Sequence, residues 1–157
     1  MTLSRHCATE EATEAAGAAL ARALPPGAEG PAVAYLEGDL GAGKTTLARG
    51  FLRALGVACP IRSPTYALVE AYEAGGRLAV HLDLYRLRDP DELPALGLRD
   101  WHRPGVTWLV EWPDKGAGHL PPPDLTVSLT PGPGGHAVVM TPSTPLGERW
   151  LASVSGG

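Results

Sequence analysis

The chain of 157 residues contains neither asparagine nor glutamine, and it has only two lysines and two cysteines. GTPases of the Ras kind recognise guanine with an Asn-Lys-x-Asp motif and orient the attacking water with a glutamine. The missing amides exclude both devices, so that mechanism of guanine-nucleotide hydrolysis is ruled out.

The cysteines and apolar runs are also too few for several classes of protein. Cys7 and Cys59 lie far apart and match no metal-binding or redox spacing. Residues 1–13 show no signal-peptide pattern, and no apolar run is long enough to cross a membrane. We therefore expect thiols without a chemical role, a cytoplasmic location and no membrane contact.

Basic charge is scarce as well. The 17 acidic residues outnumber 13 basic ones, which gives a net charge of −4. No Lys/Arg cluster stands out, so the chain is a poor candidate for binding nucleic acid unaided.

The length fits one domain, residues 1–157, of which 131–157 is weakly defined. Glycine and proline gather in segments that predict loops, at 25–31, 104–105, 121–123 and 131–135.

One of the two lysines, Lys44, lies in the Walker A or P-loop motif G-x-x-x-x-G-K-[ST] at residues 38–45. An apolar run at 32–36 predicts a strand before the motif, and a helical pattern ended by Gly56 follows it. A glycine-rich turn before an ordinary helix is the alternative. Strand, loop and helix nevertheless stand in the order that phosphate binding needs.

The motif predicts how ATP and Mg²⁺ are held. Glycines let backbone N–H groups wrap a phosphate, and the helix dipole adds partial positive charge. We expect Lys44 to reach the β- and γ-phosphates and Thr45 to bind Mg²⁺. Without side-chain amides, the base is adenine or is recognised by backbone groups. The expected ATP-binding residues of the motif and its flank are Gly38, Asp39, Leu40, Gly41, Ala42, Gly43, Lys44, Thr45 and Thr46.

Periodicity predicts the elements around this loop. A helix runs from its N-cap Thr9 to the prolines at 25–26, and we expect its small-residue face to pack closely on the sheet. Strands at 67–72 and 78–84 flank a Gly-Gly hairpin signal. The other predicted elements are a short helix at 89–97, strands at 106–110, 125–129 and 136–140, and a helix around residue 150. The predicted fold class is α/β, a P-loop NTPase-like three-layer sandwich with a mixed sheet containing an antiparallel hairpin.

Two acidic residues, Asp83 and Glu111, stand at the ends of apolar strands. Mg²⁺ held by Thr45 and phosphates needs further oxygen ligands, and hydrolysis needs a group that orients or deprotonates water. We assign Asp83 as the Walker B-like metal partner and Glu111 as the catalytic acid that also faces the metal. A carboxylate that caps a turn or pairs with arginine is the structural alternative.

A proline-bounded segment at 57–66 is expected to fold back over the phosphate site. Its Ser63 and Thr65 are candidates for a switch that contacts the γ-phosphate or Mg²⁺. The alternative is a pair of turn hydroxyls bonded to their own backbone. His81 and His119 are assigned structural or solvated roles rather than catalytic ones.

Several blocks occur together in a specific order. They are Glu-Ala-Thr at 11–13, the Walker motif, Ser-Pro-Thr-Tyr at 63–66, His-Leu-Asp-Leu-Tyr-Arg-Leu at 81–87, Glu92 with Leu-Gly-Leu at 96–98, and Glu-Trp-Pro at 111–113. In this order and spacing the chain resembles the TsaE (YjeE) family of small bacterial P-loop ATPases, from the first helix to about residue 129. Residues 131–157 depart from the family pattern.

The resemblance implies a weak ATPase, stimulated by partners, that is required for N6-threonylcarbamoyladenosine modification at position 37 of tRNAs reading ANN codons. It implies ATP-dependent binding to the TsaD–TsaB heterodimer, with tRNA contacted only through that complex. TsaD would perform the transfer from an adenylate made by TsaC, and the ATPase would reset the complex. The resemblance also implies nucleotide contacts by Thr13 and Thr65, and catalytic roles for Lys44, Asp83 and Glu111.

Two functions of other classes stay open. A small P-loop kinase would transfer the γ-phosphate to a metabolite, with a lid drawn from the scattered Arg86, Arg88, Arg99 and Arg103. A nucleotide-sensing module would bind ATP or ADP tightly without meaningful turnover.

Overall fold

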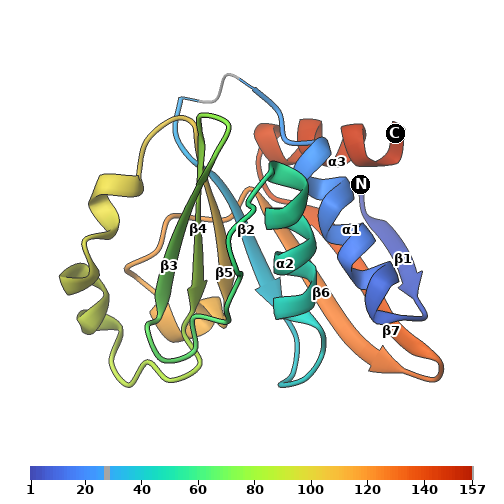
Figure 1. Cartoon of the computed structure of the whole chain (residues 1–157), viewed down its shortest axis with the longest axis horizontal. Coiled ribbons are helices and arrows are strands. Elements are labelled where there is room, and N and C mark those ends of the chain that lie inside the picture. The colour runs from blue at the N-terminus through green and yellow to red at the C-terminus, as the bar shows by residue number, and fades with distance from the viewer. Residues whose placement is uncertain (27–28, 157) are drawn as a thin grey trace.

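A mixed seven-stranded β-sheet lies between a layer of α-helices and a layer of short 3-10 helices (Figure 1). The computed structural model describes residues 1–26 and 29–156, so two residues of the predicted loop at 25–31 and the last of 131–157 lie outside it. The strands are β1 (Leu3–Cys7), β2 (Ala32–Glu37), β3 (Val69–Ala74), β4 (Arg77–Asp83), β5 (Val106–Glu111), β6 (Leu125–Gly132) and β7 (Gly135–Pro142). The helices are α1 (Glu10–Arg22), α2 (Lys44–Leu55), α3 (Pro145–Gly156), η1 (Pro90–Leu96), η2 (Leu98–Trp101) and η3 (Pro113–Gly116).

The strand order is β1-β7-β6-β2-β5-β4-β3. The four central strands β6, β2, β5 and β4 are parallel, and the outer strands join them in antiparallel pairs. The parallel centre therefore brings the C-terminal ends of β2, β4 and β5 to one edge of the sheet, where α/β folds bind ligands. The mixed sheet and the β3–β4 hairpin confirm the predicted fold class.

Helix α1 packs closely against α2, a helix-to-helix contact that the sequence did not predict. A Cβ on Gly17 would lie 2.0 Å from the Leu47 carbonyl oxygen, and one on Gly50 would lie 2.1 Å from that of Glu14. The two glycines therefore let the helix backbones meet. Trp150 of α3 fixes the third helix to this pair, because its fully buried indole N–H donates to the Leu20 carbonyl at 2.8 Å.

The edge strand β1 is an element that the sequence did not predict. It has five residues, of which Ser4, Arg5 and His6 are polar, and its partner β7 lies more than a hundred residues away along the chain. Such a strand depends on pairing rather than on its own apolar pattern. Beyond β7, α3 gives the weakly defined C-terminal segment a regular helix.

The predicted helix at 89–97 has the expected bounds but is the 3-10 helix η1. Asp89 caps it in a capping box with Glu92, and Gly97 ends it at φ +72°. Pro94 lies inside the segment and lacks the N–H that an α-helical turn would use. The second layer of the sandwich is thus built from short turns.

A cavity of about 670 Å³ lies in this layer, lined by Leu98, Trp108 and Leu120 among others. In the described ranges, no helix has the length and apolar character needed to cross a membrane.

Candidate nucleotide-binding site

Residues 38–43 connect β2 to α2 and bend around the start of that helix. Gly41 and Gly43 have φ angles of +82° and +101°, which side chains rarely adopt. A Cβ on Gly38 would lie 2.5 Å from the Leu129 carbonyl oxygen of β6. Because the N-cap Gly43 has no capping side chain, the first N–H groups of α2 remain available to an anion.

Lys44 is only 4 % exposed, and its amine folds back onto the loop. Its Nζ donates to the carbonyl oxygens of Gly38 and Asp39, the second at 3.0 Å, and lies 4.2 Å from the centre of the Trp112 ring. Burial lowers the pKa of the Lys44 amine, and nearby carboxylates, foremost that of Glu111, oppose this shift. A bound phosphate would add negative charge that favours the protonated amine.

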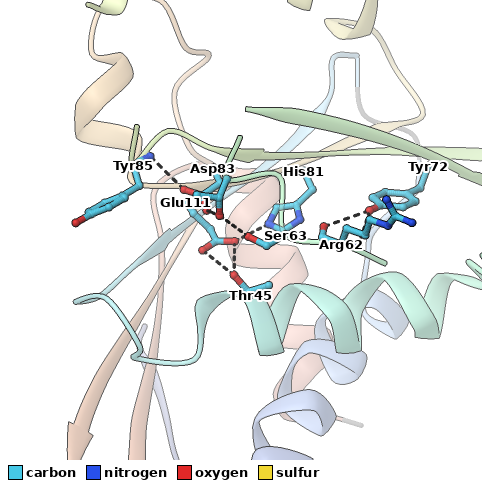
Figure 2. A network of polar contacts seen from close by, with 9 residues as sticks. Thr45, Arg62, Ser63, Tyr72, His81, Asp83, Tyr85 and Glu111 are labelled. Atoms are coloured by element: carbon cyan, nitrogen blue, oxygen red, sulfur yellow. Dashed lines mark hydrogen bonds and ion pairs between the residues drawn. The ribbon is translucent and has the colours of Figure 1, made fainter. Parts of the chain in front are cut away.

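Asp83 and Glu111 lie side by side because the parallel strands β4 and β5 pair them in register. They are 5 % and 2 % exposed. The Thr45 hydroxyl donates toward both carboxylate oxygens of Glu111, at 3.1 and 3.2 Å, and the Thr65 hydroxyl donates to Asp83 at 3.1 Å. Figure 2 shows how the two acids approach the first turn of α2. The fold thus brings the predicted metal ligands and Thr65 together, with one hydrogen-bonded pair on Glu111 and another on the neighbouring Asp83.

The segment 57–66 is non-helical up to residue 64, as its prolines predicted, and then enters a turn at 65–67 in which Thr65 reaches the site. Arg53 secures its beginning by donating to the carbonyl oxygens of Val57 and Cys59, at 2.8 and 2.9 Å. At its other end the hydroxyls of Ser63 and Thr65 lie 2.7 Å apart. Thr65 therefore bonds a carboxylate of the site and a neighbouring hydroxyl, and its role as a switch remains a prediction.

The predicted nucleotide contacts line neighbouring cavities. A cavity of about 240 Å³ is lined by Leu40, Gly41, Gly43, Lys44, Thr45, Thr46, Thr65, Asp83, Glu111 and Trp112. Another, of about 350 Å³, is lined by Gly38 and Asp39 together with Trp112 and Asp114. Ala42 is fully buried in the core, and its backbone N–H donates to the Asp39 carbonyl oxygen of the loop at 3.0 Å.

Thr13 lies apart from the acids, in a cavity of about 260 Å³ that also contains Gly43, Thr46 and His136. Its side chain is 1 % exposed, and its hydroxyl donates to the Thr9 carbonyl at 3.3 Å. This cavity and the one at Lys44 share Gly41, Gly43 and Thr46, so the two adjoin around the start of α2.

His81 is a member of the site that the sequence-based assignment missed. Its ring is fully buried, and its Nε2 lies 2.6 Å from Glu111 Oε2 (Figure 2). The signal was the alternation of β4, because residues two apart on a strand share a face and Asp83 had already been placed in the site. His119 instead pairs with the exposed Asp91 at 2.7 Å, outside this network.

The oxygen donors present fit Mg²⁺ together with phosphates. In the part of the chain that the structure describes, no three His, Cys, Asp or Glu side chains are arranged to hold a metal ion. Mg²⁺ in nucleotide sites usually takes one or two carboxylates, and phosphate and water supply the remaining ligands. Thr45, Asp83 and Glu111 provide such a partial set, which would bind Mg²⁺ as its nucleotide complex.

Taken together, the fold and the site define an α/β protein in which a Walker A sequence joins a strand to a helix beside two strand-end acids. A family model described as "Threonylcarbamoyl adenosine biosynthesis protein TsaE" matches residues 7–135. The chain belongs to the TsaE family.

Individual relatives agree with this assignment. The tRNA threonylcarbamoyladenosine biosynthesis protein TsaE of Haemophilus influenzae is 43% identical over 121 residues, which cover 77% of each chain. The protein of the same name from Nostoc is 38% identical over 130 residues, covering 80% of this chain and 76% of the relative. A crystal structure of Bacillus subtilis YdiB superposes with a TM-score of 0.76 at 28% identity, covering 99% of this chain and 95% of that one.

Proposed function

We propose that this protein is a partner-dependent, Mg²⁺-requiring ATPase of the N6-threonylcarbamoyladenosine modification of tRNA, and that it acts on a TsaD–TsaB complex. The observation that carries the ATPase assignment is the meeting of Lys44, Thr45, Asp83 and Glu111 at the uncapped start of α2. The names of its relatives support the place in tRNA modification.

Each side chain has a distinct part in hydrolysis. Lys44 neutralises charge on the β- and γ-phosphates, while the N–H groups of the loop hold them in place. Thr45 and Asp83 would hold Mg²⁺, which when bound would offset the negative charge that develops on the transferred phosphoryl group. Glu111 accepts a hydrogen bond from the attacking water and takes its proton.

Exposed apolar side chains at the opening of the site support the proposal that a protein partner binds there. Leu40, Tyr66 and Tyr85 are 69 %, 83 % and 39 % exposed, although large apolar side chains favour burial. All three belong to segments that line the site. Leu40 lies in the loop, Tyr66 is next to Thr65, and Tyr85 is two residues from Asp83. Exposed aromatic side chains around a polar cleft are typical of protein–protein contact surfaces.

The net charge of −4 also favours action on a protein rather than direct contact with tRNA. In the isolated chain the mouth is open to water, so hydrolysis should be slow. Docking of the partner would exclude water and order the segment that carries Thr65.

The deciding experiment measures free phosphate released from ATP and Mg²⁺ by the protein alone and with purified TsaD–TsaB. We expect a weak rate that rises several-fold with the partners. Glu111→Ala should lower it by about 10²- to 10⁴-fold while leaving nucleotide binding in place. Unchanged turnover in Glu111→Ala would contradict the role assigned to Glu111 as the base.

Phosphate accounting separates the alternatives. A kinase would convert ATP to ADP without releasing free phosphate, and a sensing module would bind nucleotide with no turnover in either condition. A phosphate-release rate that ignores TsaD–TsaB would contradict the partner assignment.

A further inference from the structure

We propose that His81 is a positioning residue that sets the orientation of the Glu111 carboxylate, so that Oε2 is held by the protein and Oε1 is left for the reacting water. This inference rests on the proposed ATPase function. Its geometric part concerns the protein's own side chains and can be tested without nucleotide.

The contact between these two side chains is short and secluded from solvent. His81 is fully buried and Glu111 is 2 % exposed, and the ring nitrogen Nε2 lies 2.6 Å from Oε2. Neighbouring parallel strands carry them, because His81 pairs with Leu109 on β5 and Glu111 comes two residues later on the same face. The rigid sheet therefore fixes both ends of the hydrogen bond.

The direction of this hydrogen bond follows from the chemistry of its partners. As the base of the proposed reaction Glu111 is an ionised carboxylate, which only accepts hydrogen bonds, so in this proposal His81 Nε2 carries the proton. The other ring nitrogen, Nδ1, is buried and has no hydrogen-bond partner within the described ranges. Among the residues that the structure describes, the hydrogen bond to Glu111 is therefore the one polar contact of the His81 ring.

The two oxygens of Glu111 are not equivalent. The Thr45 hydroxyl lies 3.1 Å from Oε2 and 3.2 Å from Oε1 and shares its single proton between them, whereas within the described residues the His81 ring contacts Oε2, at 2.6 Å. Two donors on one oxygen oppose rotation of the carboxylate about its last bond. Oε1 keeps acceptor capacity, and Glu111 lines the same cavity as Lys44.

A carboxylate held in this way suits the proposed reaction. Positioning a base before the reaction removes part of the entropy cost of the attack, and partners behind a functional carboxylate typically change activity by about 10- to 100-fold when they are removed. Binding of the phosphates depends instead on Lys44 and the loop. The effect of losing His81 should therefore fall on turnover much more than on nucleotide affinity.

The first test is a spectroscopic one on the nucleotide-free, ¹⁵N-labelled protein. A ring N–H that donates to a carboxylate over a short distance gives a proton resonance far downfield, coupled to the ring nitrogen. We expect one such signal, assigned to Nε2 of His81, that disappears in His81→Gln and moves upfield in Glu111→Ala. A signal from Nδ1, or none that responds to Glu111→Ala, would overturn the proposal.

The second test separates turnover from binding. His81→Leu removes the donor and keeps much of the volume, whereas His81→Gln keeps an N–H near the position of Nε2. We expect His81→Leu to lower the partner-stimulated kcat by about 10- to 100-fold, with the Kd for an ATP analogue and Mg²⁺ almost unchanged, and His81→Gln to recover most of the loss. Equal impairment in both variants, or a loss of affinity that matches the loss of turnover, would overturn it.

Val80→Ala is the matched control. Val80 is the fully buried neighbour of His81 on the opposite face of β4, so it reports the general effect of disturbing this strand. Its kcat should stay at the wild-type value even if the protein unfolds at lower urea. If the wild-type protein releases no phosphate with TsaD–TsaB, the proposed function fails, and the spectroscopic test still decides whether His81 holds Glu111.

Discussion

The two faces of the sheet use the same strands for different purposes. On β4, His81 and Asp83 point toward α2 and the Walker A segment, whereas Val80 and Leu82 point into the apolar layer beneath the 3-10 helices. On β5, Glu111 faces the loop and Val110 faces away. Strand alternation therefore separates chemistry from packing within single strands.

The helical layers that cover the two faces of the sheet also differ, in how closely they pack. On the functional face α1 and α2 meet at two glycines, and the loop before α2 is held against β6. On the other face short 3-10 helices leave a cavity of about 670 Å³ over Trp108. The comparison predicts that substitutions on the second face act on stability alone, while those at the loop act on ligand binding.

Trp108→Ala should have the largest effect on stability, about 3–5 kcal/mol, because it removes a side chain that is 1 % exposed. The change also leaves the Trp101 carbonyl without the indole N–H that donates to it at 3.0 Å. Urea unfolding measures the loss. Nucleotide affinity of the folded protein should be unchanged, and a marked change in Kd below the unfolding transition would show that the two faces are coupled.

Lys44→Ala should lower nucleotide affinity and leave the stability of the fold unchanged. Loss of charged hydrogen bonds to two phosphates costs about 3 kcal/mol, roughly 100-fold in ATP affinity. Stability should be maintained, since the amine is buried at a desolvation cost that also lowers its pKa. Titration with a fluorescent ATP analogue measures the affinity, with the other lysine, exposed Lys115, changed to alanine as the control. Normal binding by Lys44→Ala would contradict the phosphate-site assignment.

Gly17→Ala should give a smaller loss of stability, about 1–3 kcal/mol, because the new methyl group meets the Leu47 carbonyl on α2. Gly30→Ala is the matched control, since nothing lies within 4 Å of its Cβ position, and it should change stability by no more than about 0.5 kcal/mol. Thermal or urea unfolding of both variants gives the comparison. Equal stabilities would show that α1 can move away from α2 without cost.

Much of the site could be predicted from the sequence because its signals are local. The Walker motif lies within eight consecutive residues, and Asp83 and Glu111 each follow an apolar strand. Other features depended on partners distant in the chain. Strand β1 needs β7, the glycine of α1 needs α2, and the role of His81 needed the register of β4 against β5.

The sequence by itself determined the class of protein, since hydrophobic periodicity, turn residues and the phosphate-binding motif are properties of neighbouring residues. It also determined which carboxylates stand at strand ends. Only the tertiary structure decided that Thr45, His81 and Glu111 form one hydrogen-bonded chain and that Thr13 lies in an adjoining cavity. The physical reason is that a hydrogen bond tolerates a change of only a few tenths of an ångström in the donor–acceptor distance. Strand register and helix packing fix that distance, and the order of residues does not state it.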